Sequence, residues 1–181
     1  MHIRPSTPAD IQAITDIYAH HVRHGTGTFE LEAPSPAEMA RRRDDVLGHG
    51  LPFLVAEGGA PGASGLLGYA YANWFRPRPA YRYFVEDSIY LAPHAQRRGI
   101  GRLLLAELMA RCEAAGARQM VAVIGDAANA GSIGVHAALG FVHTGVLKAS
   151  GWKFDRWLDV VLMQKALGQG DATPPGAPDA A

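Results

Sequence analysis

A glycine-rich junction between an apolar strand and an amphipathic helix is the feature that most constrains the fold. Residues 83–91 are dense in β-branched and aromatic side chains, and an apolar stripe at helical spacing runs through 101–115. The loop between them, 96–102, reads Gln-Arg-Arg-Gly-Ile-Gly-Arg. A second apolar run follows the helix at 120–125. Because a strand, a helix and a strand in succession form a crossover, the sequence predicts a parallel strand pair with a helix packed on it.

The rest of the chain supplies the other elements of a mixed sheet. Proline-containing capping sequences at 7–10 and 35–38 each predict the start of a helix, the second as a full capping box, and another helix is expected over 129–139. A turn-rich run at 58–62 predicts a hairpin. After a short first strand, we expect strands at 52–57, 66–75, 83–91, 120–125, 141–147 and 157–166. The order β-α-α-β-β-β-α-β-α-β-β predicts an α/β (α+β) fold, a mixed, mostly antiparallel sheet flanked by helices on both faces.

Length and charge narrow the class of protein. The chain has 181 residues, which is typical of a single domain. We expect that domain to span 1–167, and 168–181 to be a disordered tail because they contain no large apolar side chain. Lys and Arg total 17, and Asp and Glu also total 17. The chain therefore lacks the positive charge of a general nucleic-acid binder, and no nucleic-acid partner is predicted.

The lengths of the apolar runs and the spacing of Cys and His residues argue against a membrane, secreted or metal-binding protein. No run approaches the roughly 18 apolar residues that cross a membrane, and the N-terminus shows no signal-peptide core. We therefore expect a cytoplasmic protein with no membrane partner. Cys112 is the only cysteine and lies in an apolar stripe, which favours a place in the core. His20 and His24 lie four residues apart without an intervening Glu or a third ligand, so no metal is predicted.

The loop 96–102 has the chemistry of a phosphate site. Glycines leave backbone N–H groups uncovered, and the first N–H groups of the following helix lack partners within the helix. Three arginines add positive charge beside them. The loop lacks the Lys-Ser or Lys-Thr of a nucleotide-binding P-loop, and Leu104 stands where a dinucleotide fingerprint needs its third glycine. An ordinary glycine-rich turn is the alternative.

The pattern Gln-x-x-Gly-x-Gly between a strand and a helix resembles the pyrophosphate loop of the GNAT superfamily of N-acetyltransferases. The resemblance covers about residues 2–166 and narrows to the phosphinothricin and methionine sulfoximine acetyltransferase group. It rests on the segments 27–30, 75–82, 85–90, 121–124 and 132–141. It implies acetyl-CoA as cosubstrate with no metal, and a small amino-acid-like substrate. It also implies a homodimer, for which the region 152–157 offers an apolar contact.

The resemblance also implies which residues bind the cosubstrate. Pantetheine pairs with the exposed end of the strand 83–91 as an extra strand, and a backbone N–H there polarises the thioester carbonyl. The loop 96–102 binds the pyrophosphate. Asn129 contacts the cosubstrate in this family, although a simple helix cap is an equally good interpretation. The expected cofactor-binding residues are Ile89, Tyr90, Leu91, Gln96, Arg97, Arg98, Gly99, Ile100, Gly101, Arg102, Asn129 and Ser132.

Glu86 is the candidate general base. An amino-acid amine is mostly protonated at neutral pH and must lose a proton before it can attack a thioester. Glu86 shares a strand face with Phe84, Ser88 and Tyr90, and a carboxylate beside aromatic rings is expected to have a raised pKa. The resemblance implies the same role. The alternative is a salt bridge from Glu86 to one of the nearby arginines.

His136 is the candidate general acid for the departing thiolate. It lies four residues after Ser132 on the same helical face, and a satisfied structural histidine is the alternative. Many superfamily members use a tyrosine on this helix, and none occurs between Ala128 and Gly140. Because Cys112 is expected in the core, direct transfer is favoured over an acyl-enzyme.

Three arginines in a proline-stiffened loop are candidates for the substrate's anionic head. Guanidinium groups bind carboxylate, phosphinate and sulfonyl oxygens well, and a solvated basic loop is the alternative. The expected substrate-binding residues are Arg76, Arg78, Arg82, Glu86, Asp87 and Ser88, although the side chain of Asp87 points away from that of Glu86. The predicted function is N-acetylation of the α-amino group of a small amino acid. Alternatives are a polyamine or protein N-terminal acetyltransferase, or a non-catalytic acyl-CoA sensor.

Overall fold

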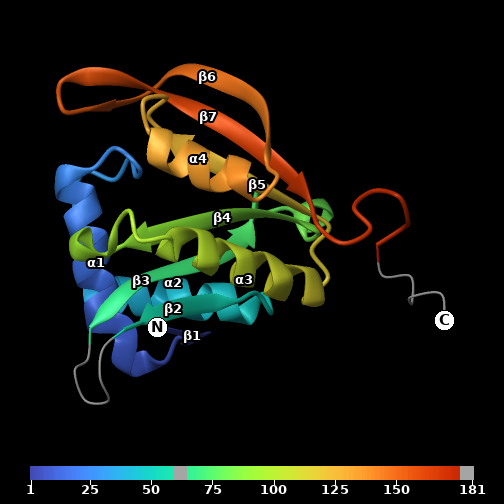
Figure 1. The fold of residues 1–181 in the computed structure, drawn as a ribbon, viewed down its shortest axis with the longest axis horizontal. Helices are drawn as coiled ribbons and strands as arrows, with labels where there is room; N and C mark the ends of the chain where they lie inside the picture. The colour runs from blue at the N-terminus through green and yellow to red at the C-terminus, as the bar shows by residue number, and fades with distance from the viewer. Residues whose placement is uncertain (59–64, 176–181) are drawn as a thin grey trace.

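The computed structural model describes residues 1–58 and 65–175, which form one seven-stranded sheet with helices on both faces (Figure 1). The strands are β1 (His2–Pro5), β2 (Phe53–Glu57), β3 (Leu66–Trp74), β4 (Phe84–Leu91), β5 (Gln119–Gly125), β6 (Val142–Lys153) and β7 (Arg156–Ala166). Their order in the sheet is β1-β2-β3-β4-β5-β7-β6. Only β4 and β5 pair in parallel; every other neighbouring pair is antiparallel. The predicted fold class and element order are confirmed.

Two helical layers enclose the sheet. The helices are α1 (Ile11–His24), α2 (Pro36–Gly48), α3 (Ile100–Ala114) and α4 (Ala130–Ala138). Figure 1 shows α3 and α4 in front of the sheet, while α1 and α2 lie behind it. The crossover from β4 through α3 to β5 is the predicted parallel connection.

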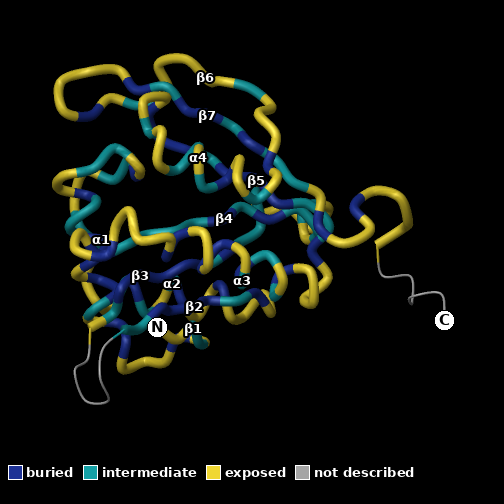
Figure 2. The backbone as a smooth tube through the Cα atoms, in the orientation of Figure 1, coloured by how far each residue is buried: buried dark blue, intermediate teal, exposed yellow. Residues whose placement is uncertain are grey.

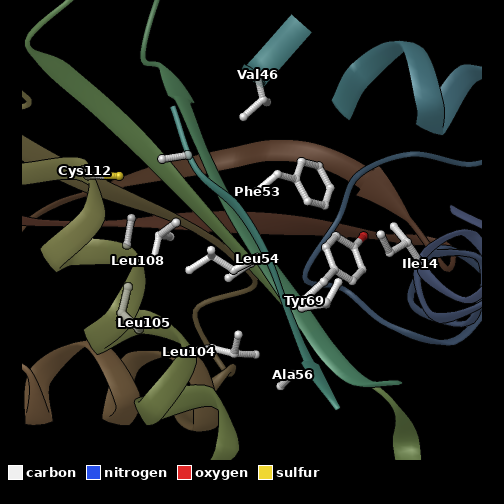
Figure 3. Close-up of a cluster of buried hydrophobic side chains, with 14 of the residues drawn as sticks. Ile14, Val46, Phe53, Leu54, Ala56, Tyr69, Leu104, Leu105, Leu108 and Cys112 are labelled. Carbon is white, nitrogen blue, oxygen red and sulfur yellow. The ribbon is translucent and has the colours of Figure 1, made fainter. Parts of the chain in front are cut away.

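The core is divided by the alternation of side chains along β2. Phe53 packs on the α1 and α2 side near Tyr69, whereas Leu54 points to the α3 side (Figure 3). On α3 the fully buried side chains include Leu104, Leu105 and Leu108. Cys112 is buried on α3, as predicted.

The N-terminal helix begins later than its capping sequence suggested. Residues Pro8–Asp10 form a short 3-10 turn, and α1 starts at Ile11. The carboxylate of Asp10 accepts hydrogen bonds from the Thr7 backbone at 2.7 Å and from the Arg4 guanidinium at 2.8 Å. These bonds keep the first turn tight.

At α2, Ser35 caps the helix by accepting from the Glu38 N–H at 3.2 Å. The prediction of a full capping box was wrong. The Glu38 carboxylate does not bond back to the helix start but binds Arg41 and Arg42, at 2.9 Å and 2.8 Å from their Nε atoms. Two charged partners outweigh a single backbone donor for a carboxylate.

The strand expected at 141–147 extends to Lys153 as β6, and it begins at Val142 because Phe141 is buried in the preceding turn. The register against β7 shifts between Leu147 and Gly151, where Ala149 adopts a positive φ of 48°. Such a bulge interrupts the alternation that marks a strand in sequence. β6 is an edge strand and most of it is exposed (Figure 2).

Two sequence expectations concern segments that the structure describes only in part. The hairpin turn predicted at 58–62 lies, apart from Gly58, outside the described residues, although β2 and β3 do pair as a hairpin. Residues 168–175 form turns and bends, and Arg118 donates to the hydroxyl of Thr173 at 2.6 Å. The remainder of the tail is outside the described range, so its disorder and the domain limit at 167 stay predictions.

Candidate active site

A cleft opens where the two parallel strands separate. β4 and β5 pair only as far as Asp87 and Ala122, yet β4 continues to Leu91 and β5 to Gly125. A cavity of about 840 Å³ occupies the gap. It is bordered by both strand ends, by residues 25–29 after α1, by the glycine-rich loop and by the start of α4. The splayed strand end implied by the family resemblance is therefore present.

The glycine-rich loop forms one end of this cleft. Gly99 caps α3 with a φ of 77°, and Arg97 also has a positive φ, of 57°. These left-handed residues turn the chain sharply from β4 into α3. Because the first N–H groups of α3 lack helical partners and arginines lie beside them, the loop has the donor set that a pyrophosphate requires.

Most of the predicted loop residues border the cavity, and two do not. Those that do are Gln96, Arg97, Gly99, Gly101 and Arg102. Ile100 is 3% exposed and packs in the core, so only its backbone is available to a ligand. Arg98 is exposed and is absent from the cavity wall. Ile89, Tyr90 and Leu91 all border the cavity from β4.

The start of α4 forms a second wall of the cleft. The Asn129 side chain accepts from the Ser132 N–H at 3.1 Å and thereby caps the helix. Both residues also border the cavity. The cap interpretation of Asn129 is confirmed, and its contact with a cosubstrate stays a prediction.

Glu86 faces the cavity together with Tyr71 and Ser88. Burial removes water from its carboxylate, and the neighbouring charge of Asp87 adds to this effect. Together they raise the pKa of Glu86 to about 7, although Arg76 acts in the opposite direction. Within residues 1–58 and 65–175, no salt bridge joins Glu86 to an arginine, so the alternative of a simple ion pair is not found.

Asp87 lies on the opposite face of β4 and forms a buried pair with His136. The Oδ2 atom of Asp87 is 3.0 Å from Nε2 of His136, and Nδ1 of His136 is 2.7 Å from the Ser132 carbonyl oxygen. Burial alone would lower the pKa of His136, but the hydrogen bond and charge of Asp87 outweigh it and raise the pKa. As an imidazolium, His136 donates to both partners.

This pairing changes the interpretation of both residues. His136 is only 4% exposed and both of its ring nitrogens have partners, which is the geometry of the structural alternative. To protonate a thiolate, His136 would first have to break one of these bonds. Asp87 directs its carboxylate toward His136, and both residues also border the cavity, so the substrate contact of Asp87 and the acid role of His136 stay predictions. Sequence reasoning did not find this pair.

The arginine loop lies beside the cleft and not in its wall. Arg76 stacks on the Phe75 ring and Arg82 on the Tyr83 ring, each with its guanidinium carbon 4.5 Å from the ring centroid. Arg76, Arg78 and Arg82 are exposed, and none of them borders the cavity. Of the three, Arg76 influences the pKa of Glu86 through its charge. Their exposure also fits the alternative of a solvated basic loop, so their contact with the substrate stays a prediction.

None of the helices in residues 1–58 and 65–175 is both long and apolar enough to cross a membrane. In the same part of the chain, no three His, Cys, Asp or Glu side chains are grouped as ligands for a metal ion.

Comparison with known proteins shows the family. The sequence model of the acetyltransferase (GNAT) family matches residues 15–141. Phosphinothricin N-acetyltransferase of Alcaligenes faecalis is 55% identical over 166 residues, covering 92% of this chain and 82% of the relative. L-methionine sulfoximine/L-methionine sulfone acetyltransferase of Pseudomonas aeruginosa is 38% identical over 169 residues, covering 91% and 94%.

A solved structure extends the similarity to three dimensions. The GNAT superfamily phosphinothricin acetyltransferase of Sinorhizobium meliloti, crystallised in complex with AcCoA, has a TM-score of 0.92 and 48% identity. The match covers 99% of this chain and 96% of that one. The chain belongs to the GNAT family and is an N-acetyltransferase. The resemblance to the phosphinothricin and methionine sulfoximine group is confirmed.

Proposed function

We propose that this enzyme transfers acetyl from acetyl-CoA to the α-amino group of a small amino acid of the phosphinothricin, methionine sulfoximine or sulfone type. The observation that carries the proposal is Glu86, a carboxylate with a pKa of about 7 in a cleft that ends at a glycine-rich helix start. The names of the similar enzymes support the choice of substrate.

The residues of the cleft fit acetyl-CoA. The glycine-rich loop with Arg97 and Arg102 suits its pyrophosphate, and the unpaired end of β4 suits its amide-bearing arm. One acceptor on that strand end is already used, because His21 donates from Nε2 to the Leu91 carbonyl at 2.8 Å. When bound, acetyl-CoA supplies the acetyl group as a reactive thioester.

Groups of the protein then remove the proton of the substrate amine and polarise the thioester. Glu86 accepts the proton of the substrate amine, directly or through one water, and its pKa near 7 keeps much of it ionised at neutral pH. The backbone N–H groups of residues 89–91 are the candidate donors to the thioester oxygen. Burial raises the pKa of Cys112 to about 12, which leaves it without nucleophilic character and favours direct transfer.

Replacing Arg76, Arg78 and Arg82 one at a time by Ala is expected to raise KM for the amino acid. Loss of one charge-assisted hydrogen bond corresponds to roughly a tenfold effect for the arginine that meets the substrate head. KM for acetyl-CoA should stay unchanged, because none of the three belongs to the glycine-rich loop or to the unpaired end of β4. Steady-state kinetics with each substrate varied in turn measure both constants. A rise confined to KM for acetyl-CoA would place the loop at the other substrate.

Replacing Gly99 by Ala is expected to weaken acetyl-CoA binding. At a φ of 77° a Cβ atom strains the backbone by roughly 1–2 kcal/mol, so the loop must shift or distort. We expect KM for acetyl-CoA to rise several-fold and the thermal midpoint to fall. Gly134→Ala is the matched control, since Gly134 is helical and open space surrounds it. Equal behaviour of the two variants would argue against a role for the loop geometry.

CoA release from acetyl-CoA, measured in parallel with L-phosphinothricin, L-methionine sulfoximine and spermidine, tests the proposed function. Fast turnover with either amino-acid analogue is the expected result. Turnover with spermidine alone would replace the substrate class by polyamines. Binding of acetyl-CoA without turnover on a wider amine panel, including N-terminal peptides, would support the acyl-CoA sensor.

We also propose that the enzyme is a homodimer and that it acts in the cytoplasm. The end of the β6–β7 hairpin exposes Trp152 and Trp157, with 54% and 62% of their surface accessible. Their rings lie 5.3 Å apart and form one apolar patch. Sedimentation velocity of the wild type and of Trp157→Lys tests the dimer: the wild type should sediment as a dimer and the variant should shift toward monomer.

A further inference from the structure

Lys153 is a buried cation whose partners lie far away in the sequence. It is 4% exposed at the end of β6, and its Nζ donates to the carbonyl oxygens of Gly25 at 2.9 Å and Thr28 at 2.8 Å. Neither partner is a carboxylate, so an ion pair does not explain why the ammonium is buried. Burial lowers the pKa of Lys153, with Glu30 opposing this effect. Both acceptors lie in residues 25–29, which we call the cleft loop.

Two glycines, one on β5 and one on β6 across the intervening β7, make room for the cleft loop. A Cβ atom built on Gly151 of β6 would lie 2.4 Å from Cδ2 of Phe29. A Cβ atom on Gly125, at the end of β5, would lie 2.4 Å from the carbonyl oxygen of Thr26. Real Cβ atoms do not approach so closely, so the loop depends on both glycines as well as on Lys153.

The other side of the cleft loop is tied to the helical layer. The Thr28 hydroxyl lies 2.9 Å from the Tyr18 hydroxyl of α1, and Glu30 accepts from Arg42 of α2 at 2.6 Å. In Figure 1 the segment after α1 reaches toward the β6–β7 hairpin. The cleft loop therefore bridges the two halves of the sheet where β4 and β5 separate, and all five of its residues border the cavity that Glu86 faces.

We propose that Lys153 is a positioning residue that fixes the cleft loop as the wall of the amine site. The role rests on the proposed function, because it concerns binding of the amino acid near Glu86. Lys153 itself does not border the cavity and acts through the Gly25 and Thr28 carbonyls. Without it, the two carbonyls would have no cationic donor and the loop would separate from β6.

Lys153→Met tests the proposal, with Lys148→Met as the matched control. Lys148 lies on the same strand, but it is exposed and binds the Asp159 carboxylate at 2.8 Å, away from the loop. We expect Lys153→Met to raise KM for the amino acid by about tenfold or more, as expected for loss of a charged hydrogen bond. KM for acetyl-CoA should change little, Lys148→Met should change neither constant, and Lys153→Arg should recover part of the loss.

Hydrogen exchange of the free enzyme provides a readout that needs no substrate. Faster exchange across the cleft loop in Lys153→Met, and not in Lys148→Met, is expected. If wild-type enzyme turned over none of the proposed amino acids, this measurement would still decide whether Lys153 fixes the cleft loop. Unchanged exchange together with unchanged KM for the amino acid would overturn the proposal, as would equal rises in both KM values.

Gly151→Ala keeps Lys153 and displaces the Phe29 ring from β6, so it decides the matter if Lys153→Met does not fold. The same faster exchange and the same rise in KM for the amino acid are expected. Wild-type exchange and kinetics in Gly151→Ala would then count against the cleft loop as the wall of the amine site.

Discussion

Glu86→Gln should lower kcat by about 10²–10⁴-fold, the usual contribution of a positioned general base. Glutamine has nearly the same size as glutamate, so the cavity and the β4 backbone should be preserved. The glutamine amide cannot accept the proton of the amine. In the variant, only solvent water is left to remove that proton. KM for acetyl-CoA should stay within about twofold, because loss of a base leaves cosubstrate binding intact. An unchanged kcat would remove Glu86 from the mechanism.

The pH profile tests the same residue independently. A base acts only when deprotonated, so below the Glu86 pKa of about 7 the value of kcat/KM should fall tenfold for each unit of pH. Ionisation of the substrate amine affects wild type and variant alike. The break near pH 7 should therefore be present in wild type and missing in Glu86→Gln. The same break in both enzymes would assign it to another group.

The second large effect is on stability. Asp87→Ala should lower the free energy of unfolding by about 3 kcal/mol or more, because it leaves His136 buried without its charged partner. For a chain of this length this corresponds to a fall of roughly 6–12 °C in Tm. Urea unfolding measures the free energy directly. Glu107→Ala, which breaks a partly exposed ion pair with Arg111, is the control and should lower the free energy of unfolding by under about 1 kcal/mol.

The pH dependence of that stability has a defined sign. His136 has a raised pKa in the folded state, so it binds a proton more tightly there than in the unfolded chain. The stabilisation is fully present below the unfolded value of about 6.5 and is lost as the pH rises through the folded pKa. This decline should be absent in Asp87→Ala. A wild-type stability that rose over the same interval would contradict a protonated His136.

The order of elements could be predicted because each leaves a local signal. The β4–α3–β5 crossover follows from apolar runs on either side of a helical stripe, and the Gly99 turn marks where α3 begins. Alternation along β4 also predicts a raised pKa for Glu86, although its main cause in the structure is burial, with the charge of Asp87 adding to it. The helix and strand assignments need only the pattern of residues within each element.

What could not be predicted depends on contacts between distant segments. Asp87 and His136 are 49 residues apart, and Lys153 is at least 125 residues from both of its acceptors. No spacing rule connects such positions, so the sequence places Asp87 among the substrate-binding residues and assigns no role to Lys153. The length of β6 was missed for a different reason, because the bulge before Gly151 breaks the strand pattern.

The most direct test of the proposed reaction is the identity of the bond that forms. Acetyl-CoA labelled with ¹³C at the thioester carbonyl would be incubated with L-methionine sulfoximine labelled with ¹⁵N at the α-amino group. Because that substrate carries two nitrogens, NMR of the product distinguishes them. Acetylation of the α-amino group, the proposed reaction, predicts a carbonyl carbon with one-bond coupling to ¹⁵N. An uncoupled acetyl group, on the other nitrogen or on the protein, would contradict it.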